Sequence, residues 1–223
     1  MTSDSLEQLA GLEIACRFLF TALHQPPSDD FLQQLTSEEL LHHWPVESDG
    51  QALINALTLM NRFLAAREGH KVAQIKEDFN ALFIGPHELK AVPWSSVYLT
   101  EEQLVMTEPA MAVRSFYRHY GVEIHTGEHE PDDHIGLQFA FMAHLIGRAL
   151  DAVEQDQAYE PWVEAIGEFL THHVLTWSGR FLEVMETGAE TDFYKGLAQL
   201  TGLTLKQLAE VSGAEYRIVR LYR

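Results

Sequence analysis

Cysteine is almost missing from this 223-residue sequence, in which Cys16 is the single example. One thiol forms no disulfide within the chain, and it cannot supply a zinc or iron–sulfur site built on cysteine. Chains without disulfides are typical of reducing compartments. The near absence of cysteine therefore favours a cytoplasmic protein.

Basic residues are also scarce: 15 lysines and arginines stand against 33 aspartates and glutamates, which gives a formal net charge of −18. A negative surface repels phosphate backbones and anionic lipid headgroups, and it attracts cationic ligands. We therefore expect no nucleic-acid partner, and we expect a charged partner to be cationic.

Long apolar runs are lacking as well. The longest, residues 135–147, contains Gln138 and His144 and is shorter than the roughly 20 residues that a membrane helix needs. The first residues place no basic group ahead of an apolar run, so they do not form a signal peptide. These absences predict a soluble cytoplasmic chain with no membrane insertion.

The standard signatures of catalysis are absent too, among them the phosphate-binding loop, the dinucleotide-binding glycine pattern, the nucleophile elbow and the paired-histidine zinc motif. Ser95 and Ser96 have no identifiable base, so we interpret them as hydrogen-bonding loop residues. His125, His129 and His134 are ligand types that metals accept, but their spacing fits no standard site. The sequence thus contains no standard catalytic signature, and we expect no metal site. The alternative is a small metal- or nucleotide-dependent enzyme that uses the region from His125 to His134.

Helical periodicity is what the sequence does contain. Apolar residues in the first segment recur at spacings of three and four, which is typical of one face of a helix over residues 5–24. Equivalent patterns predict helices over residues 28–35, 49–64, 72–83, 109–120, 131–149, 161–176, 178–186 and 192–211. No alternating β pattern is present. The sequence therefore predicts an all-α fold, a single-domain helical bundle over residues 1–223 with two long loops at 84–107 and 123–130.

The segment 131–149 is apolar nearly all round, so we expect it in the centre of the bundle. Pro131 at its first position, followed by Asp132 and Asp133 near the positive end of the helix dipole, is a good helix start that needs no ligand. Alternatively, His134 faces inward beside Asp133, and the pair lies at a groove where a guanidinium binds through charge-assisted hydrogen bonds.

The loop segment 93–98 also has two interpretations. Trp94 and Tyr98 either fill the core beneath the loop or line an apolar slot that accepts the leucine and phenylalanine side chains of a partner. In both cases the segment follows the amphipathic helix predicted over residues 72–83.

Three short motifs occur in a fixed order: FNALF at 79–83, PWSSVY at 93–98 and EPDDH at 130–134. In this order and spacing they resemble the DmsD/TorD family of redox-enzyme maturation chaperones. The likeness covers most of the chain and extends to Arg17, to WSGRFL at 177–182 and to the ending at 203–223, which looks more like DmsD than TorD.

The resemblance implies an all-helical, non-catalytic cytoplasmic chaperone. Such a chaperone binds the twin-arginine signal peptide on the catalytic subunit of a molybdoenzyme precursor, of the DMSO or TMAO reductase type, and holds the precursor until cofactor insertion and export. The resemblance also implies weak GTP binding without a resident cofactor, transient contact with the export translocase, and either a monomer or a domain-swapped oligomer.

Carried over position by position, the resemblance implies a peptide-binding surface made of Arg17, Phe79, Leu82, Phe83, Pro93, Trp94, Ser96, Glu130, Asp133 and His134. The sequence departs from the family pattern at His24, where a tyrosine is common, and at Thr107, where a glycine is common.

The acidic and apolar members of this surface have different predicted roles. We predict that Asp133, with Glu130 and His134, binds the two arginines. We predict that the apolar stretch after the arginines is held by Leu82, Phe83 and Trp94. A third interpretation is a helical adaptor that binds a folded partner through its acidic face. It predicts strongly salt-sensitive binding that needs no arginine pair.

Overall fold

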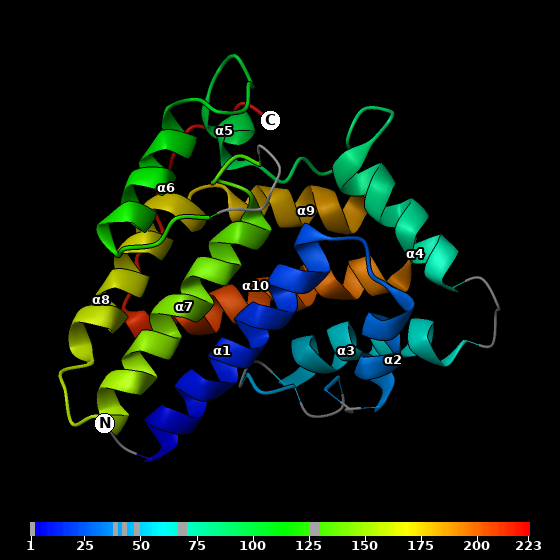
Figure 1. The fold of residues 1–223 in the computed structure, drawn as a ribbon. Coiled ribbons are helices and arrows are strands. Elements are labelled where there is room, and N and C mark those ends of the chain that lie inside the picture. The colour runs from blue at the N-terminus through cyan, green and yellow to red at the C-terminus, as the bar shows by residue number, and fades with distance from the viewer. Residues whose placement is uncertain (1–2, 38–39, 42–43, 47–49, 67–70, 125–129) are drawn as a thin grey trace.

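The computed structural model describes residues 3–37, 40–41, 44–46, 50–66, 71–124 and 130–223. In these ranges the chain consists of helices, turns and loops with no β-strand, and a single isolated bridge pairs Trp94 with His134. This confirms the predicted all-α fold (Figure 1). None of the described helices is both long enough and apolar enough to cross a membrane.

The α-helices, in chain order, are α1 (Ser3–His24), α2 (Asp29–Ser37), α3 (Gly50–Ala65), α4 (Lys71–Phe79), α5 (Ser95–Leu99), α6 (Glu108–His119), α7 (Ile135–Glu154), α8 (Glu160–Phe169), α9 (Ser178–Gly188) and α10 (Asp192–Ser212). Two short π-helical turns, Asn80–Ile84 and Leu170–Val174, extend α4 and α8. These turns account for the longer helices that the periodicity predicts over 72–83 and 161–176.

Helices α1 and α7 lie side by side through the middle of the molecule, and α10 crosses behind them (Figure 1). Apolar residues on all sides of α7, among them Leu137, Phe139, Phe141 and Leu145, are buried, which confirms its predicted central position. The two helices run antiparallel, because Gly136 at the start of α7 lies against His24 at the end of α1, whereas Gly147 lies against Glu13. A Cβ added at Gly136 would stand 2.9 Å from the His24 Cβ, so only glycine allows this approach.

The start of α7 differs from the prediction. The helix begins at Ile135 rather than Pro131, and His134 is its N-cap, with an extended backbone and a ring nitrogen that accepts from the Gly136 N–H at 3.0 Å. Residues 131–134 do not extend the helix because they lie against the segment 93–95 instead. Asp132 and Asp133 therefore do not lie in the first helical turn. The alternative prediction, that His134 faces inward beside Asp133, describes the structure, since both residues are buried.

Other predicted boundaries agree closely with the structure. Ser28 caps α2, because its hydroxyl accepts from the Phe31 N–H at 3.1 Å. Gly121 follows α6 with a φ of 72°, the left-handed conformation expected after a helix. The predicted helix start at Asp49 falls outside the described residues.

The two predicted long loops have different outcomes. The connection at 84–107 contains the five-residue helix α5 between two irregular stretches. The centre of the second, residues 125–129, lies outside the part of the chain that the structure describes.

The C-terminal residues after α10 return to α5. The Tyr222 N–H donates to the Tyr98 carbonyl at 2.9 Å, and Arg223 donates to the Leu89 carbonyl at 2.8 Å. Residues 222 and 223 thus support the same loop region that carries the PWSSVY motif.

Candidate functional site

Two of the three sequence motifs pair with each other through backbone hydrogen bonds. The Ile135 N–H donates to the Pro93 carbonyl at 2.9 Å, and the Ser95 N–H donates to the Asp133 carbonyl at 3.3 Å. These bonds flank the antiparallel bridge between Trp94 and His134. We call residues 93–96 and 130–135 the paired-loop site.

Asp133 links the two segments of this site through hydrogen bonds. Its side chain is fully buried. One carboxylate oxygen, Oδ2, accepts from the Ser96 N–H at 2.7 Å and from the Ser95 hydroxyl at 3.0 Å. These contacts fix the first turn of α5. The Ser95 hydroxyl forms a hydrogen bond as predicted, whereas Ser96 donates through its backbone and its buried hydroxyl has no partner among the described residues. Both serines lie in the first turn of α5 rather than in a loop. Burial raises the pKa of Asp133, and the bonds from Ser96 and Ser95 act in the opposite direction.

Glu130 positions the indole of Trp94. The Trp94 Nε1–H donates to Glu130 Oε1 at 2.6 Å, and the ring meets the His134 ring edge-on with 5.9 Å between centroids. Both Trp94 and Glu130 are partly exposed, in contrast to Asp133. A carboxylate beside an aromatic ring is thus the part of the paired-loop site that a ligand can reach.

His134 lies beneath this pair and is neutral. Its Nδ1 accepts from the Gly136 N–H, so the ring proton is on Nε2. Burial, and to a lesser extent the neighbouring His24, lowers the pKa of His134 to about 3. The His24 ring contacts the His134 ring at 5.2 Å between centroids, so the family position where a tyrosine is common still holds a packed ring.

Helix α6 is joined to the same site through an ion pair that the sequence did not reveal. The Arg114 Nε donates to Asp132 Oδ2 at 2.7 Å, and the Tyr117 hydroxyl donates to the Asp132 carbonyl at 3.0 Å. Thr107, where the family commonly has glycine, is the N-cap of α6 with a φ of −91°. This backbone suits any L-residue, so the threonine is accommodated without strain.

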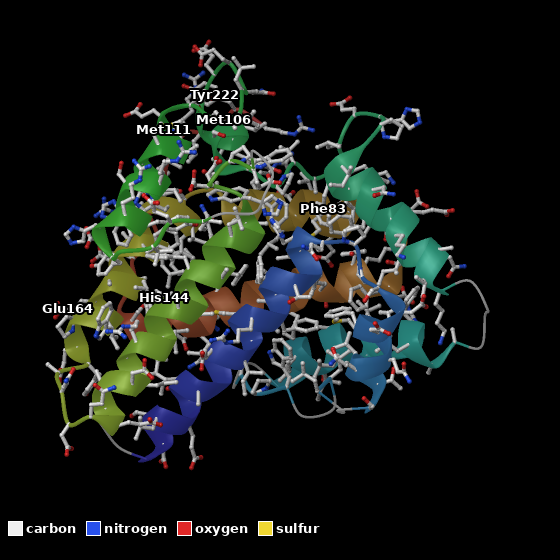
Figure 2. The ribbon with its side chains drawn as sticks, viewed as in Figure 1. Phe83, Met106, Met111, His144, Glu164 and Tyr222 are labelled. Atoms are coloured by element: carbon white, nitrogen blue, oxygen red, sulfur yellow. The ribbon has the colours of Figure 1, made fainter. Side chains whose placement is uncertain are left out.

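The third motif, FNALF at 79–83, lies in the hydrophobic core. Phe79, Leu82 and Phe83 are buried in the core, and the Phe83 ring packs against rings of Phe79, Phe181 and Tyr194. Figure 2 shows Phe83 inside the molecule near α9. The Ala91 N–H donates to the Leu82 carbonyl at 3.0 Å, which guides the chain toward Pro93. The side chains predicted to hold an apolar stretch at Leu82 and Phe83 are thus covered in this structure.

Arg17 lies apart from the paired-loop site. It stands on the exposed side of α1 and pairs with Glu13 at 2.6 Å. His24, which does contact the site, is seven residues further along α1, or about 10 Å along the helix axis. Arg17 is therefore two turns away from His24, on the α1 surface beside α7, where it helps to lower the pKa of His144 after burial and Arg148.

Among the described residues, no group of three or more His, Cys, Asp or Glu side chains is arranged to hold a metal ion. His125 and His129, on which the metal- or nucleotide-dependent alternative rests, lie outside the described residues. The structure therefore shows no geometry for that alternative.

Comparison with known proteins identifies the family. Residues 47–183 match the family model described as the nitrate reductase delta subunit. The chain is 30% identical over 219 residues to the probable Tat proofreading chaperone DmsD of Haemophilus influenzae, which covers 96% of this chain and 98% of the relative. It is 29% identical over 176 residues to the Tat proofreading chaperone DmsD of Salmonella typhimurium, covering 79% of this chain and 76% of that protein.

The similarity extends to the second branch of the predicted family. The chain is 27% identical over 180 residues to the chaperone protein TorD of Aliivibrio fischeri, which covers 76% of this chain and 82% of the relative. These names confirm the prediction of a chaperone rather than an enzyme. The motifs, the all-helical fold and these relatives agree, and the chain belongs to the DmsD/TorD family of chaperones.

Proposed function

We propose that this protein is a cytoplasmic chaperone for the twin-arginine signal peptide on the catalytic subunit of a molybdoenzyme of the DMSO or TMAO reductase type. It binds the peptide and holds the precursor until the cofactor is inserted and export begins. The proposal is supported by relatives that carry the name Tat proofreading chaperone. The structural observation that carries it is the paired-loop site, where an acidic side chain and an indole lie together on a fixed frame.

Glu130 and Trp94 have the chemistry that an arginine needs. A guanidinium forms a charge-assisted hydrogen bond with a carboxylate, and its flat face stacks on an aromatic ring. Asp133 is buried and already accepts two hydrogen bonds. We therefore assign the contact with arginine to Glu130 and Trp94, and we assign to Asp133 the positioning of the loop that carries Trp94.

The charge of the whole chain assists capture. A net charge of −18 attracts the cationic end of a signal peptide over long distances. Salt screens exposed charges beyond about 8 Å at physiological ionic strength. The overall charge therefore speeds the encounter, whereas selectivity for arginine comes from the local contacts at the paired-loop site.

Titration calorimetry with synthetic peptides tests the proposal. One peptide carries two adjacent arginines before an apolar segment, and its matched control carries two lysines at the same positions. Lysine keeps the charge but lacks the planar fork, so we expect it to bind about tenfold more weakly. Equal binding of both peptides, lost at high salt, would instead support an acidic adaptor.

A protein variant provides a second control. Glu130→Gln removes the carboxylate at the paired-loop site, and Glu7→Gln removes an equally negative, exposed side chain from the first turns of α1. We expect only Glu130→Gln to lower the preference for arginine over lysine. The same loss in both variants would show that net charge, and not this site, governs recognition.

Nucleotide binding, translocase contact and oligomeric state are further parts of the proposal. We propose no resident cofactor. Equilibrium dialysis tests the weak GTP binding that the family resemblance implies. Sedimentation distinguishes a monomer from a domain-swapped oligomer. Affinity purification from the native host, followed by identification of the co-purified precursor, names the reductase and detects translocase components.

A further inference from the structure

An exposed group of apolar side chains lies next to the paired-loop site. Leu104, Val105 and Met106 follow one another in the loop before α6, and they are 60%, 43% and 45% exposed. Met111, at the end of the first turn of α6, is 42% exposed. Figure 2 shows Met106 and Met111 at the same end of the molecule, close to Tyr222. We call Leu104, Val105, Met106 and Met111 the apolar patch.

The backbone holds this patch outward. Gln103 and Met106 have φ values of 52° and 58°, a region that residues other than glycine rarely adopt. The loop is nevertheless anchored, because the Thr100 N–H donates to the Ser96 carbonyl at 3.1 Å and the Gln103 side chain donates to the Tyr222 carbonyl at 2.5 Å. The loop is therefore anchored just before the exposed apolar side chains.

Two connections tie the patch to the paired-loop site. Met111 lies one helical turn before Arg114, on the same face of α6, and Arg114 pairs with Asp132. The loop also follows directly from α5, whose first turn is held by Asp133. Residues 95–98 of α5 are buried, whereas the Arg114 side chain is 38% exposed. A peptide bound at Trp94 therefore reaches the patch over Arg114 on α6, and not along α5.

The charge around the patch selects its occupant. Glu101, Glu102 and Glu108 are exposed at its rim. An apolar surface with an acidic rim fits an apolar segment that has cationic residues beside it. A second copy of this chain would bring the same carboxylates face to face, and anionic lipid headgroups would be repelled. The methionines suit a partner of variable sequence, since their unbranched thioether side chains adapt to different shapes.

We propose that the apolar patch receives the apolar segment that follows the two arginines of the signal peptide, while Glu130 and Trp94 take the arginines. This inference rests on the proposed function. It moves the apolar contact from Leu82 and Phe83, which are buried in the core, to side chains that are exposed. The peptide then passes over Arg114, whose side chain is 38% exposed, from the paired-loop site to the start of α6.

Calorimetry with two protein variants tests the inference. The double variant Leu104→Ser with Met111→Ser removes two apolar contacts from the patch. Ile54→Ser is the matched control, because Ile54 is 58% exposed and lies on α3, at the other end of the molecule (Figure 1). One peptide has two arginines and a leucine-rich segment, and a second has serines in place of those leucines.

We expect the double variant to bind the leucine peptide at least about tenfold more weakly than the wild type, because two partly buried side chains are lost from the contact. The serine peptide should bind both proteins equally, and Ile54→Ser should behave as the wild type. Wild-type affinity of the double variant for the leucine peptide would overturn the inference and leave the proposed function intact. If the wild type bound neither peptide, the proposed function and the assigned occupant would both fail.

Crosslinking gives an answer that does not depend on the variants folding. A benzophenone side chain in the leucine segment should label residues 104–111 of the wild-type protein, identified by mass spectrometry of the digest. Labelling only of α3, α9 or α10 would refute the assignment. Sedimentation gives a further test. If the wild type sedimented as a dimer, and the double variant were monomeric with unchanged peptide binding, a second copy of the chain would cover the patch. That result would also overturn the inference.

Discussion

Removal of the Asp133 carboxylate separates a positioning role from direct contact with the peptide. In Asp133→Ala the Ser96 N–H and the Ser95 hydroxyl lose their shared acceptor in a buried place. A buried donor left without a partner costs about 1–3 kcal/mol, so we expect the free energy of unfolding to fall by about 3 kcal/mol. For a chain of this size that corresponds to a melting temperature lower by about 6–12 °C.

Asp133→Asn is the matched variant, because its amide oxygen still accepts from the Ser96 N–H. We expect it to unfold within about 1 kcal/mol of the wild type at pH 7. If Asp133 acts by positioning, this variant also binds the arginine peptide as tightly as the wild type. A tenfold loss of arginine binding in a fully stable Asp133→Asn protein would refute the reasoning and show that Asp133 contacts the peptide directly.

The pH dependence adds an independent check. Burial raises the pKa of Asp133, so the folded state favours the protonated form. The stability that this group contributes is present at low pH and is lost as pH rises through its folded pKa. Asparagine resembles the protonated form and does not titrate. In urea unfolding between pH 3 and pH 7, we therefore expect the stability of Asp133→Asn to improve relative to the wild type as pH rises. The opposite trend would mean that the charge itself stabilises the site.

Three further predictions concern the packing of the site. Trp94→Phe keeps an aromatic ring but loses the donor to Glu130, so we expect weaker binding of the arginine peptide in calorimetry with less than about 1 kcal/mol change in stability. Burial lowers the pKa of His134 to about 3, so its ring signals in NMR should not titrate between pH 8 and 6. The stability that the neutral ring contributes should be lost as pH falls from about 6.5 toward 3. A ring that titrates near pH 6.5 would contradict the burial. Gly136→Ala forces a Cβ against α1 and should cost about 1–3 kcal/mol in thermal unfolding, whereas Gly179→Ala, which meets open space in α9, should be neutral or stabilising by about 0.5 kcal/mol.

Local patterns predicted the helices because each helix buries a face whose spacing is visible in the sequence. The stripe that includes Phe79 and Phe83 belongs to such a face, and both side chains are buried as periodicity requires. The family resemblance placed the same residues on a binding surface. In the structure both side chains are part of the hydrophobic core, as the spacing predicts.

Long-range pairing explains what the sequence did not predict. The start of α7 moved from Pro131 to Ile135 because residues 93–95 pair with residues 133–135, across a separation of about 38 positions that no local rule describes. Arg114 was missed for the same reason, since its helical position was visible but its partner Asp132 was not. The outward turn of Met106 depends on a left-handed backbone that propensity would not assign to methionine.

The fastening by Asp133 has a kinetic consequence for clients. If the paired-loop site binds a signal peptide as proposed, its two segments are already held together by Asp133, so most of the entropy of ordering falls on the peptide. Leaders rich in glycine lose more freedom than leaders rich in leucine. We therefore expect residence times on this chaperone to follow the stiffness of the leader, even among clients with identical arginine pairs.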